Sequence, residues 1–165
     1  AYIYETNHIS RDSASHQFNL SSGSQILGGF GLSGVHGRGN ILGEQNESTA
    51  GQIAVGQTIL NRAQHPRFPG SVCGVVKEGK HIQGLPVKDR CQFSFYCDGR
   101  SDVPREPQAY EKALRLSEWL LLTKDWIPDL TDGALYYHAS WMEIWPKWSQ
   151  EKRRLLQIDS HVFYQ

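Results

Sequence analysis

Two glutamates lie just ahead of a predicted helix, where an acidic side chain can be held in place for proton transfer. Glu44 and Glu47 precede the segment 49–63. Thr49, followed three residues later by Gln52, fits a capping box, in which each side chain bonds a backbone N–H of the other residue. A carboxyl group beside a helix N-terminus can be oriented and its pKa tuned, as an acid catalyst requires. These two residues are therefore the first candidates for catalysis.

The helix over 49–63 is predicted from hydrophobic periodicity. Apolar residues recur at the spacing of one buried helical face, at Val55, Ile59, Leu60 and Ala63. The helix should end before His65-Pro66, because the residue preceding a proline is biased away from helical angles. Both glutamates then lie in the loop before the helix, outside the packed stripe.

Length, charge and hydropathy indicate one soluble domain. A chain of 165 residues is long enough to bury one substantial core. Lysines plus arginines number 17, as do aspartates plus glutamates, so no general attraction to nucleic acid or to an anionic membrane is expected, although a local basic patch is compatible with this balance. No run of about twenty apolar residues predicts a membrane span, and the first residues lack the pattern of a signal peptide.

The remaining segments predict an α+β domain. A second helix is expected over 107–123, where Pro107 suits the first turn and a broad apolar face is formed by Ala109, Tyr110, Ala113, Leu114, Leu120 and Leu121. Strand-forming residues fill 133–138, and two further strands, 155–158 and 161–164, are separated by a tight turn at Asp159-Ser160. Between the helices, 64–104 alternates turn signals with short apolar runs, which predicts irregular structure around a groove.

The beginning of the chain differs in composition from the rest. Residues 1–43 are rich in Ser, Gly, Asn and His and show few periodic apolar positions. We therefore divide the chain into an N-terminal extension over 1–43 and a folded domain over 44–165.

Three cysteines leave the redox state open. Cys73, Cys91 and Cys97 allow one disulfide and one remaining thiol. A bridge between Cys91 and Cys97 would enclose a short loop, but Cys73 with either partner is also compatible with the sequence. Three buried thiols that behave as small apolar side chains are the remaining alternative.

Taken together, several short motifs resemble the SleB-type cell wall hydrolases, a family that includes spore cortex-lytic enzymes. The motifs are G-Q-x-A-V at 51–55, L-N-R at 60–62, F-P-x-S-V-C-G-V-V at 68–76 and C-Q-F-S-x-x-C-D at 91–98, followed by L-Y-Y-H at 135–138 and I-D-S-H-V-F-Y at 158–164. The resemblance runs from about Glu44 to the C-terminus. It implies a lysozyme-like single domain, with helices and a small antiparallel sheet, and makes 44–165 the catalytic domain.

The resemblance also implies a reaction on peptidoglycan glycan strands without a cofactor. In lytic transglycosylases, one glutamate protonates the leaving oxygen of the MurNAc-GlcNAc bond, and the muramic 6-hydroxyl attacks to form an anhydro-sugar. Burial against apolar groups keeps such a glutamate protonated. The family pattern E-A-R-G-E-x-x-x-G-Q places Glu44 as the acid, but one residue is missing between the two acidic positions here, so Glu47 is the competing candidate. A muramidase, which adds a second carboxylate, is the hydrolytic variant.

Candidate substrate-binding residues follow from the same motifs. They are Gln92, Phe93 and Ser94 in the Q-F-S element, with Tyr136, Tyr137 and His138 in the later strand. Polar groups beside aromatic rings can hold sugar hydroxyls and stack on sugar faces, whereas the alternative for these aromatic residues is core packing. The same choice applies to Trp141, Trp145 and Trp148, for which we favour a place in the core.

Two other classes of function compete. A cysteine peptidase or amidase acting on the wall peptide would use Cys73, Cys91 or Cys97 with His138 or His161. A non-catalytic glycan-binding or structural protein is the second alternative. The histidines and cysteines lack H-E-x-x-H or paired C-x-x-C spacing, so no metal site is expected. The place of action implied by the resemblance is the cell wall or the periplasm, reached after removal of a signal or as a delivered protein, for example in a virion.

Overall fold

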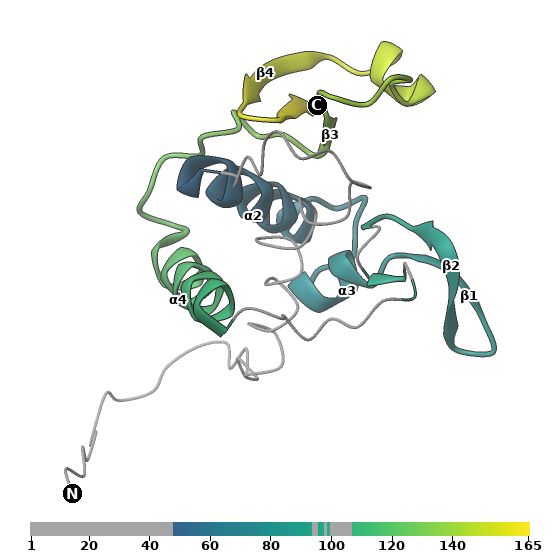
Figure 1. Ribbon diagram of the computed structural model, residues 1–165, viewed down its shortest axis with the longest axis horizontal. Coiled ribbons are helices and arrows are strands. Elements are labelled where there is room, and N and C mark those ends of the chain that lie inside the picture. Colours follow the sequence, from purple (N-terminus) through teal and green to yellow (C-terminus); the bar gives the residue numbers. More distant parts are fainter. Residues whose placement is uncertain (1–47, 94–95, 98, 100–106) are drawn as a thin grey trace, which may run out of the picture.

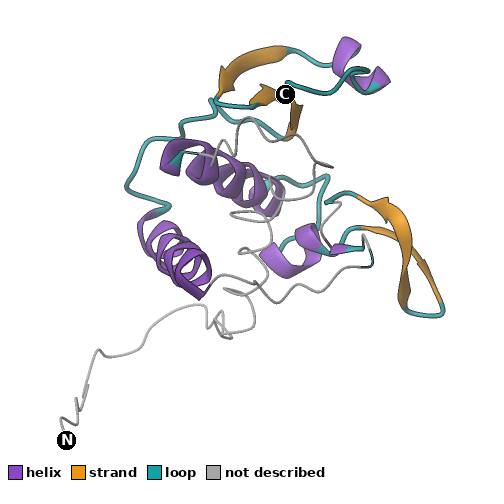
Figure 2. Ribbon diagram, in the orientation of Figure 1, coloured by secondary structure: helices purple, strands orange, loops and turns teal. Residues whose placement is uncertain are grey.

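The helix α2, Thr49–Gln64, lies between the other elements of the fold. The computed structural model describes residues 48–93, 96, 97, 99 and 107–165. In Figure 1, α4 lies on one side of α2, the three-stranded sheet lies on the opposite side, and α3 lies near its C-terminal end. Contacts join α2 to α3, α4, β3 and β4. The expected α+β domain, with a helical part and a small antiparallel sheet, is confirmed (Figure 2).

The start of α2 differs by one residue from the predicted cap. Ser48, in an extended conformation, is the N-cap, and its side chain accepts a hydrogen bond from the Gly51 N–H. The capping box predicted between Thr49 and Gln52 is therefore wrong, because Thr49 already lies inside the helix. Both Ser and Thr are good caps, and the tertiary contacts of Ser48 described below decide between them.

The buried face of α2 matches the predicted stripe. Val55, Ile59 and Leu60 are buried, and Ala63 packs at the edge of the same core. The helix ends at Gln64, and His65 is extended, as expected for a residue before proline. Burial continues around the helix to polar residues, so α2 is covered on more than one face.

The second helix, α4, spans Pro107–Thr123 as predicted. Ala113 and Leu120 are buried and form one core cluster with Leu60 of α2, while Leu121 is partly buried beside them. Leu114, which was expected on the apolar face, is exposed. Among the α4 side chains that the structure describes, the buried apolar ones, Ala113 and Leu120, form a narrow stripe against Leu60 of α2.

Three antiparallel strands form a sheet in the order β3-β5-β4. The strand β3 is Tyr136–Ala139, β4 is Arg154–Ile158 and β5 is His161–Tyr164. Every residue of the central strand β5 is buried, and the predicted turn at Asp159-Ser160 joins β4 to β5. Asp159 has a φ of 47°, a left-handed conformation that such a tight turn requires. The short 3-10 helix η2, Lys147–Gln150, lies between β3 and β4.

The segment after α2 is more regular than predicted. It contains the short helix α3, Val72–Val76, and an antiparallel hairpin of β1, Gly79–Ile82, and β2, Leu85–Cys91. The two-residue turn at Gln83-Gly84 has positive φ at both positions, as a type I′ hairpin needs. The hairpin extends away from α2 (Figures 1 and 2). No helix in the described part of the chain is long and apolar enough to cross a membrane.

The central strand should dominate the stability of the sheet. Phe163 is fully buried beside Val55 of α2, so Phe163→Ala removes its packing and leaves a cavity. We expect a loss of about 3–5 kcal/mol in the free energy of unfolding, measured by urea denaturation. Leu122→Ala, at an exposed position of α4, is the control and should change it by less than about 0.5 kcal/mol. Equal losses in both variants would contradict this core assignment.

Candidate functional site

The N-terminus of α2 is tied to the turn between β4 and β5. The Ser48 backbone N–H donates to Asp159 Oδ2 at 3.2 Å, and the Ser48 hydroxyl donates to the same oxygen. Gly51 leaves room for this contact, since a Cβ there would lie 2.6 Å from Asp159 Oδ2 and would displace the carboxylate. The candidate acids Glu44 and Glu47 lie outside the described residues. The structure therefore describes the point at which the acidic segment enters α2.

A group of aromatic side chains from β3, β5 and the 92–97 segment lies close to the same turn. The Tyr137 ring is 5.1 Å from the His161 ring, 5.8 Å from Phe163 and 6.3 Å from Phe93, measured between centroids. Tyr137 is half-buried, whereas Phe93, His161 and Phe163 are buried. One side of Tyr137 therefore belongs to the core, and the other reaches the surface.

His161 is held in its neutral form. Burial lowers its pKa to about 4. The negative charge of Asp159 opposes this change, and His138 lowers the pKa slightly further. A neutral imidazole at this place adds no positive charge beside the Tyr137 ring. The folded domain therefore resists protonation of His161 until the pH approaches 4.

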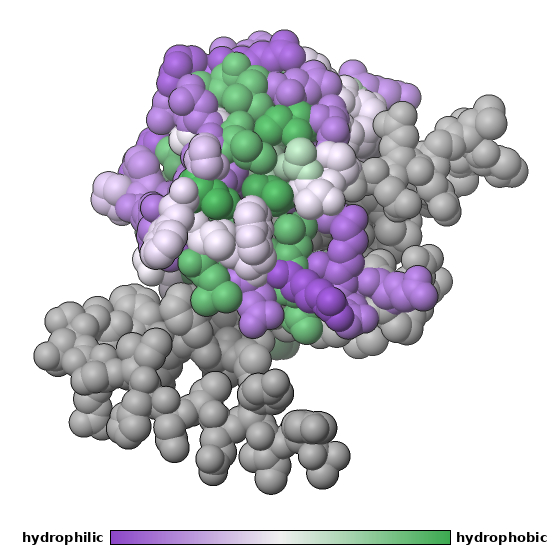
Figure 3. Space-filling view, turned by 90° about the vertical axis from the view of Figure 1, so that its left-hand side faces the viewer, coloured by the Kyte–Doolittle hydropathy of each residue, from purple (hydrophilic) through white to green (hydrophobic). Residues whose placement is uncertain are grey.

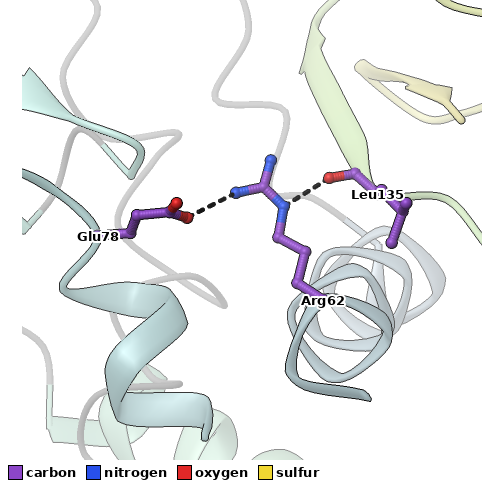
Figure 4. Close-up of polar contacts among 3 residues, drawn as sticks. All are labelled: Arg62, Glu78 and Leu135. Carbon is purple, nitrogen blue, oxygen red and sulfur yellow. Dashed lines mark hydrogen bonds and ion pairs between the residues drawn. The ribbon is translucent and has the colours of Figure 1, made fainter. Parts of the chain in front are cut away.

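The guanidinium of Arg62 crosslinks the C-terminal part of α2 to two other segments (Figure 4). Its Nε donates to the carbonyl oxygen of Leu135 at 2.5 Å, and its Nη1 lies 3.9 Å from Glu78 Oε2. Arg62 is 2% exposed, and burial lowers its pKa, while the negative charge of Glu78 opposes that change. An arginine remains charged in proteins, so this buried charge depends on the groups that surround it.

Three aromatic rings complete the surroundings of Arg62. The guanidinium carbon lies 4.9 Å from the centroid of Phe68, 5.2 Å from Tyr136 and 5.3 Å from Phe93. These are cation–π distances, and they bring β3, the 92–97 segment and the loop after α2 to one point. The arginine of the L-N-R motif thus has a structural role, because its non-covalent contacts hold these segments together.

His138 is bound on both ring nitrogens. Its Nδ1 is 3.0 Å from the Ala139 carbonyl oxygen, which only accepts, so Nδ1 donates there. Its Nε2 is 2.8 Å from the Tyr164 hydroxyl and accepts from it in the neutral ring. The His138 ring also packs against Trp145 and Trp148. These contacts assign His138 to the packing of the sheet against the 145–148 segment.

The candidate binding residues occupy different environments. Phe93 and His138 are buried, Tyr136 and Tyr137 are half-buried, and Gln92 is exposed while its backbone N–H donates to the Glu78 carbonyl oxygen at 2.8 Å. Ser94 lies outside the described residues. The structure brings Phe93 and Tyr136 together around Arg62 and places Tyr137 next to Phe93.

The three tryptophans near the end of the chain do not all join the core as expected. Trp148 is half-buried and packs against Tyr136 and Tyr164. Trp141 and Trp145 are exposed, so the prediction of a core position is wrong for these two. Pro146 and the short turn of η2 separate them from Trp148 and direct them elsewhere.

The disulfide joins Cys91 to Cys97, and Cys73 is the remaining thiol. Two of the three candidate nucleophiles of a cysteine peptidase are therefore oxidised, which leaves Cys73 alone for that alternative. Within the described ranges, no group of three or more His, Cys, Asp or Glu side chains is arranged to hold a metal ion.

Sequence reasoning overlooked Ser48 and Asp159 and underestimated Arg62. Arg62 was visible as the end of the L-N-R motif and as a residue near a helix end, where a favourable interaction with the helix dipole explains it equally well. Asp159 was visible as a turn residue within the motif at 158–164. Its contact with Ser48 spans 111 positions of the chain, and nothing in the local pattern indicates it.

The buried neutral His161 predicts a pH dependence of stability. In the unfolded chain, histidine titrates near pH 6.5, so below that pH the unfolded state binds a proton that the folded state does not bind until about pH 4. As the pH falls from 6.5 to 4, this residue should lower the free energy of unfolding by at most about 1.4 kcal/mol per pH unit. Urea unfolding of the wild type and His161→Gln across this range measures the difference. Identical slopes would contradict the burial of a neutral ring.

Comparisons with known proteins agree with the observed fold. The sequence matches the family model described as Cell Wall Hydrolase over residues 46–164. No curated protein matches the chain. The catalytic domain of the Bacillus cereus SleB protein is similar in structure, with a TM-score of 0.54 and 22% sequence identity over 94% of this chain and 98% of that one.

The catalytic domain of the germination-specific lytic transglycosylase SleB from Bacillus anthracis is also similar, with a TM-score of 0.56 and 22% identity over 93% of this chain and 100% of that one. At this identity, the two structures establish a shared fold. Because the family model covers most of the chain, including all the described elements, the protein belongs to the cell wall hydrolase family.

Proposed function

We propose that this protein cleaves the glycan strands of peptidoglycan and that a glutamate just before α2 is the general acid. The observation that carries the proposal is the family match over 46–164, which begins between the two candidate glutamates and includes the anchored start of α2. Glu44 is the first candidate, at the place of the earlier glutamate in the family pattern, and Glu47 is the second. In this proposal, 44–165 is the catalytic domain and 1–43 an N-terminal extension.

The contact between Ser48 and Asp159 supports the proposal through positioning. A general acid must lie within hydrogen-bond reach of the leaving oxygen, so the segment that carries it needs a fixed origin. Ser48 is bonded through its backbone and its side chain to the turn of the sheet, one residue after Glu47. Its hydroxyl also holds the first turn of α2 through Gly51. The acidic segment is thus followed directly by a residue, Ser48, whose position relative to β5 is fixed.

The half-buried Tyr137 and Tyr136 supply the proposed sugar-contacting surface. Tyr137 is held from behind by Phe93, His161 and Phe163, so its ring orientation is set by packing. Tyr136 is held by Arg62 on the core side. The exposed parts of such fixed rings can contact a sugar without losing further side-chain freedom. Gln92, which is exposed, is the polar candidate beside them.

Within this reaction class, we favour lytic transglycosylation over hydrolysis. The solved structure from Bacillus anthracis is described as a lytic transglycosylase. Transglycosylation needs one acidic residue, since the muramic 6-hydroxyl replaces water as the nucleophile. Asp159, a described carboxylate that lies at the start of α2, already accepts two hydrogen bonds from Ser48 and is therefore engaged in holding the helix start. The proposed place of action is the cell wall, reached by export or delivery in a virion.

Products from purified sacculi test the reaction and its acid together. Mass spectrometry should detect anhydro-muropeptides with the wild type, and their formation should fall by at least about 100-fold in Glu44→Gln, the scale of lost general acid catalysis. Loss only in Glu47→Gln would move the role to that residue. Glu118→Gln, on an exposed part of α4, is the matched control and should retain activity.

The other products separate the competing functions. Products with hydrated reducing ends would replace transglycosylation by hydrolysis. Cleavage of the wall peptide would overturn the glycosidase proposal. Binding to sacculi without any soluble product, where a control enzyme works, would indicate a glycan-binding protein.

Thiol alkylation gives a second, independent test against a cysteine peptidase. With the disulfide intact, Cys73 is the only thiol that iodoacetamide can modify. A glutamate-dependent glycosidase should keep its rate of product release within about twofold, because no thiolate enters its transition state. Parallel treatment of Cys73→Ser controls for reaction at other side chains. Abolished cleavage in the wild type, with full cleavage in treated Cys73→Ser, would contradict the proposal.

A further inference from the structure

The loop between β3 and η2 exposes an unusual concentration of apolar side chains. Four of the five residues from 141 to 145 are large and apolar, and they are exposed by 68% (Trp141), 37% (Met142), 84% (Ile144) and 39% (Trp145). We call these five residues the apolar loop. It belongs to the part of the chain that extends beyond β3 in Figure 1, on the far side of the sheet from α4. Single exposed apolar residues need no explanation, but four exposed apolar residues within five positions do.

Basic side chains follow the apolar loop directly. From 147 to 154 there are four of them, Lys147, Lys152, Arg153 and Arg154, against one acidic residue, Glu151. Two lie on aromatic rings of this region, with Lys152 Nζ 4.4 Å from the Tyr136 centroid and the Arg154 guanidinium 5.9 Å from Trp145. The chain is neutral as a whole, yet it is locally basic around the apolar loop, where Glu143 is the only charged member.

Three of the four apolar side chains of the apolar loop offer no free ring face to a sugar. Sugars stack on free, flat ring faces, but the Trp145 ring already contacts His138 at 4.7 Å between centroids and also lies under Arg154. Ile144, the most exposed member, and Met142 have no ring. Aliphatic side chains are stabilised by transfer from water to an apolar phase, and indole rings favour the boundary between that phase and water.

We propose that the apolar loop docks this protein on a membrane surface that contains anionic lipids. Ile144 and Trp141 enter the interfacial region, where indole rings are favoured, and the basic residues at 147–154 lie at the level of the lipid phosphates. Charge complementarity and the mixture of indole and aliphatic side chains select this occupant. The inference is independent of the proposed cleavage reaction, because the acids and the sugar-contacting residues to which that proposal assigns roles lie outside the apolar loop.

A second exposed apolar surface provides the matched control. On α4 and the following segment, the exposed residues are Leu114, Trp119, Leu122, Trp126 and Leu130. Figure 3 looks at the side of the molecule that carries α4 and shows hydrophobic side chains gathered among hydrophilic ones. The charges within 111–125 balance, with three acidic and three basic residues. This surface is thus apolar without a basic surrounding, and it should not select anionic lipid.

Vesicle flotation tests the proposal on the full chain. Vesicles of phosphatidylcholine with phosphatidylglycerol should bind the wild type, and vesicles of phosphatidylcholine alone should bind it much less. Trp141→Ser/Ile144→Ser should weaken binding to the anionic vesicles at least about tenfold, as expected for keeping large apolar side chains out of the interface. Lys147→Gln/Arg153→Gln should weaken it and reduce its salt dependence. Leu122→Ser/Trp126→Ser should bind like the wild type.

Several outcomes would overturn the proposal. They are absence of binding by the wild type, unchanged binding by Trp141→Ser/Ile144→Ser, or loss of binding in the α4 variant instead. If Trp141→Ser/Ile144→Ser loses binding to purified sacculi while keeping vesicle binding, the loop is a glycan site. Circular dichroism checks that each variant is folded, and the salt dependence of wild-type vesicle binding tests the basic residues without any substitution. Product release from soluble wall fragments should be the same in all three variants, which separates docking from cleavage.

Discussion

The burial of α2 on more than one face is the constraint on which the other described elements depend. This helix carries the polar side chains of Gln57, Thr58 and Arg62 inward, and each of them needs a partner. Thr58 donates to the Ala54 carbonyl, and Gln57 both donates to the Pro128 carbonyl and accepts from the Leu130 N–H. Arg62 donates to the Leu135 carbonyl. The buried polar groups of α2 thereby fix the path of the whole connection from α4 to β3.

The two ends of α2 are held by contacts with different parts of the three-stranded sheet region. A helix of 16 residues is about 24 Å long and rigid, so the anchor of Ser48 on the sheet turn and the anchor of Arg62 on the start of β3 are separated by a fixed length. Both anchors belong to one sheet, whose register pairs Tyr137 with Phe163. A change in that register would move Tyr137 to the opposite face and separate it from the helix start. The site geometry therefore depends on the sheet as much as on α2.

The sequence predicted the elements whose apolar pattern is local. The spans of α2 and α4 follow from period and proline position, and the pair β4 and β5 follows from strand-forming residues around a turn. The hairpin of β1 and β2 was missed because most of its side chains are exposed and show no alternation of apolar and polar residues. The disulfide was one of several compatible pairings, and the position of Asp159 beside Ser48 depends on a contact between distant segments. Such features are decided by tertiary structure, and short sequence windows contain no record of them.

Aromatic residues show the same limit, because composition alone cannot distinguish a buried ring from an exposed one. Trp148 and Trp141 occur in the same short segment, yet η2 turns Trp148 against Tyr136 and Tyr164 while Trp141 faces water. Burying Trp148 gains stability that Trp141 and Ile144 do not provide in the folded monomer. Exposed apolar groups of this kind favour self-association. They do not stabilise the folded chain, because they remain in contact with water. Their place beside a basic segment is therefore better explained by contact with another surface than by the requirements of this fold.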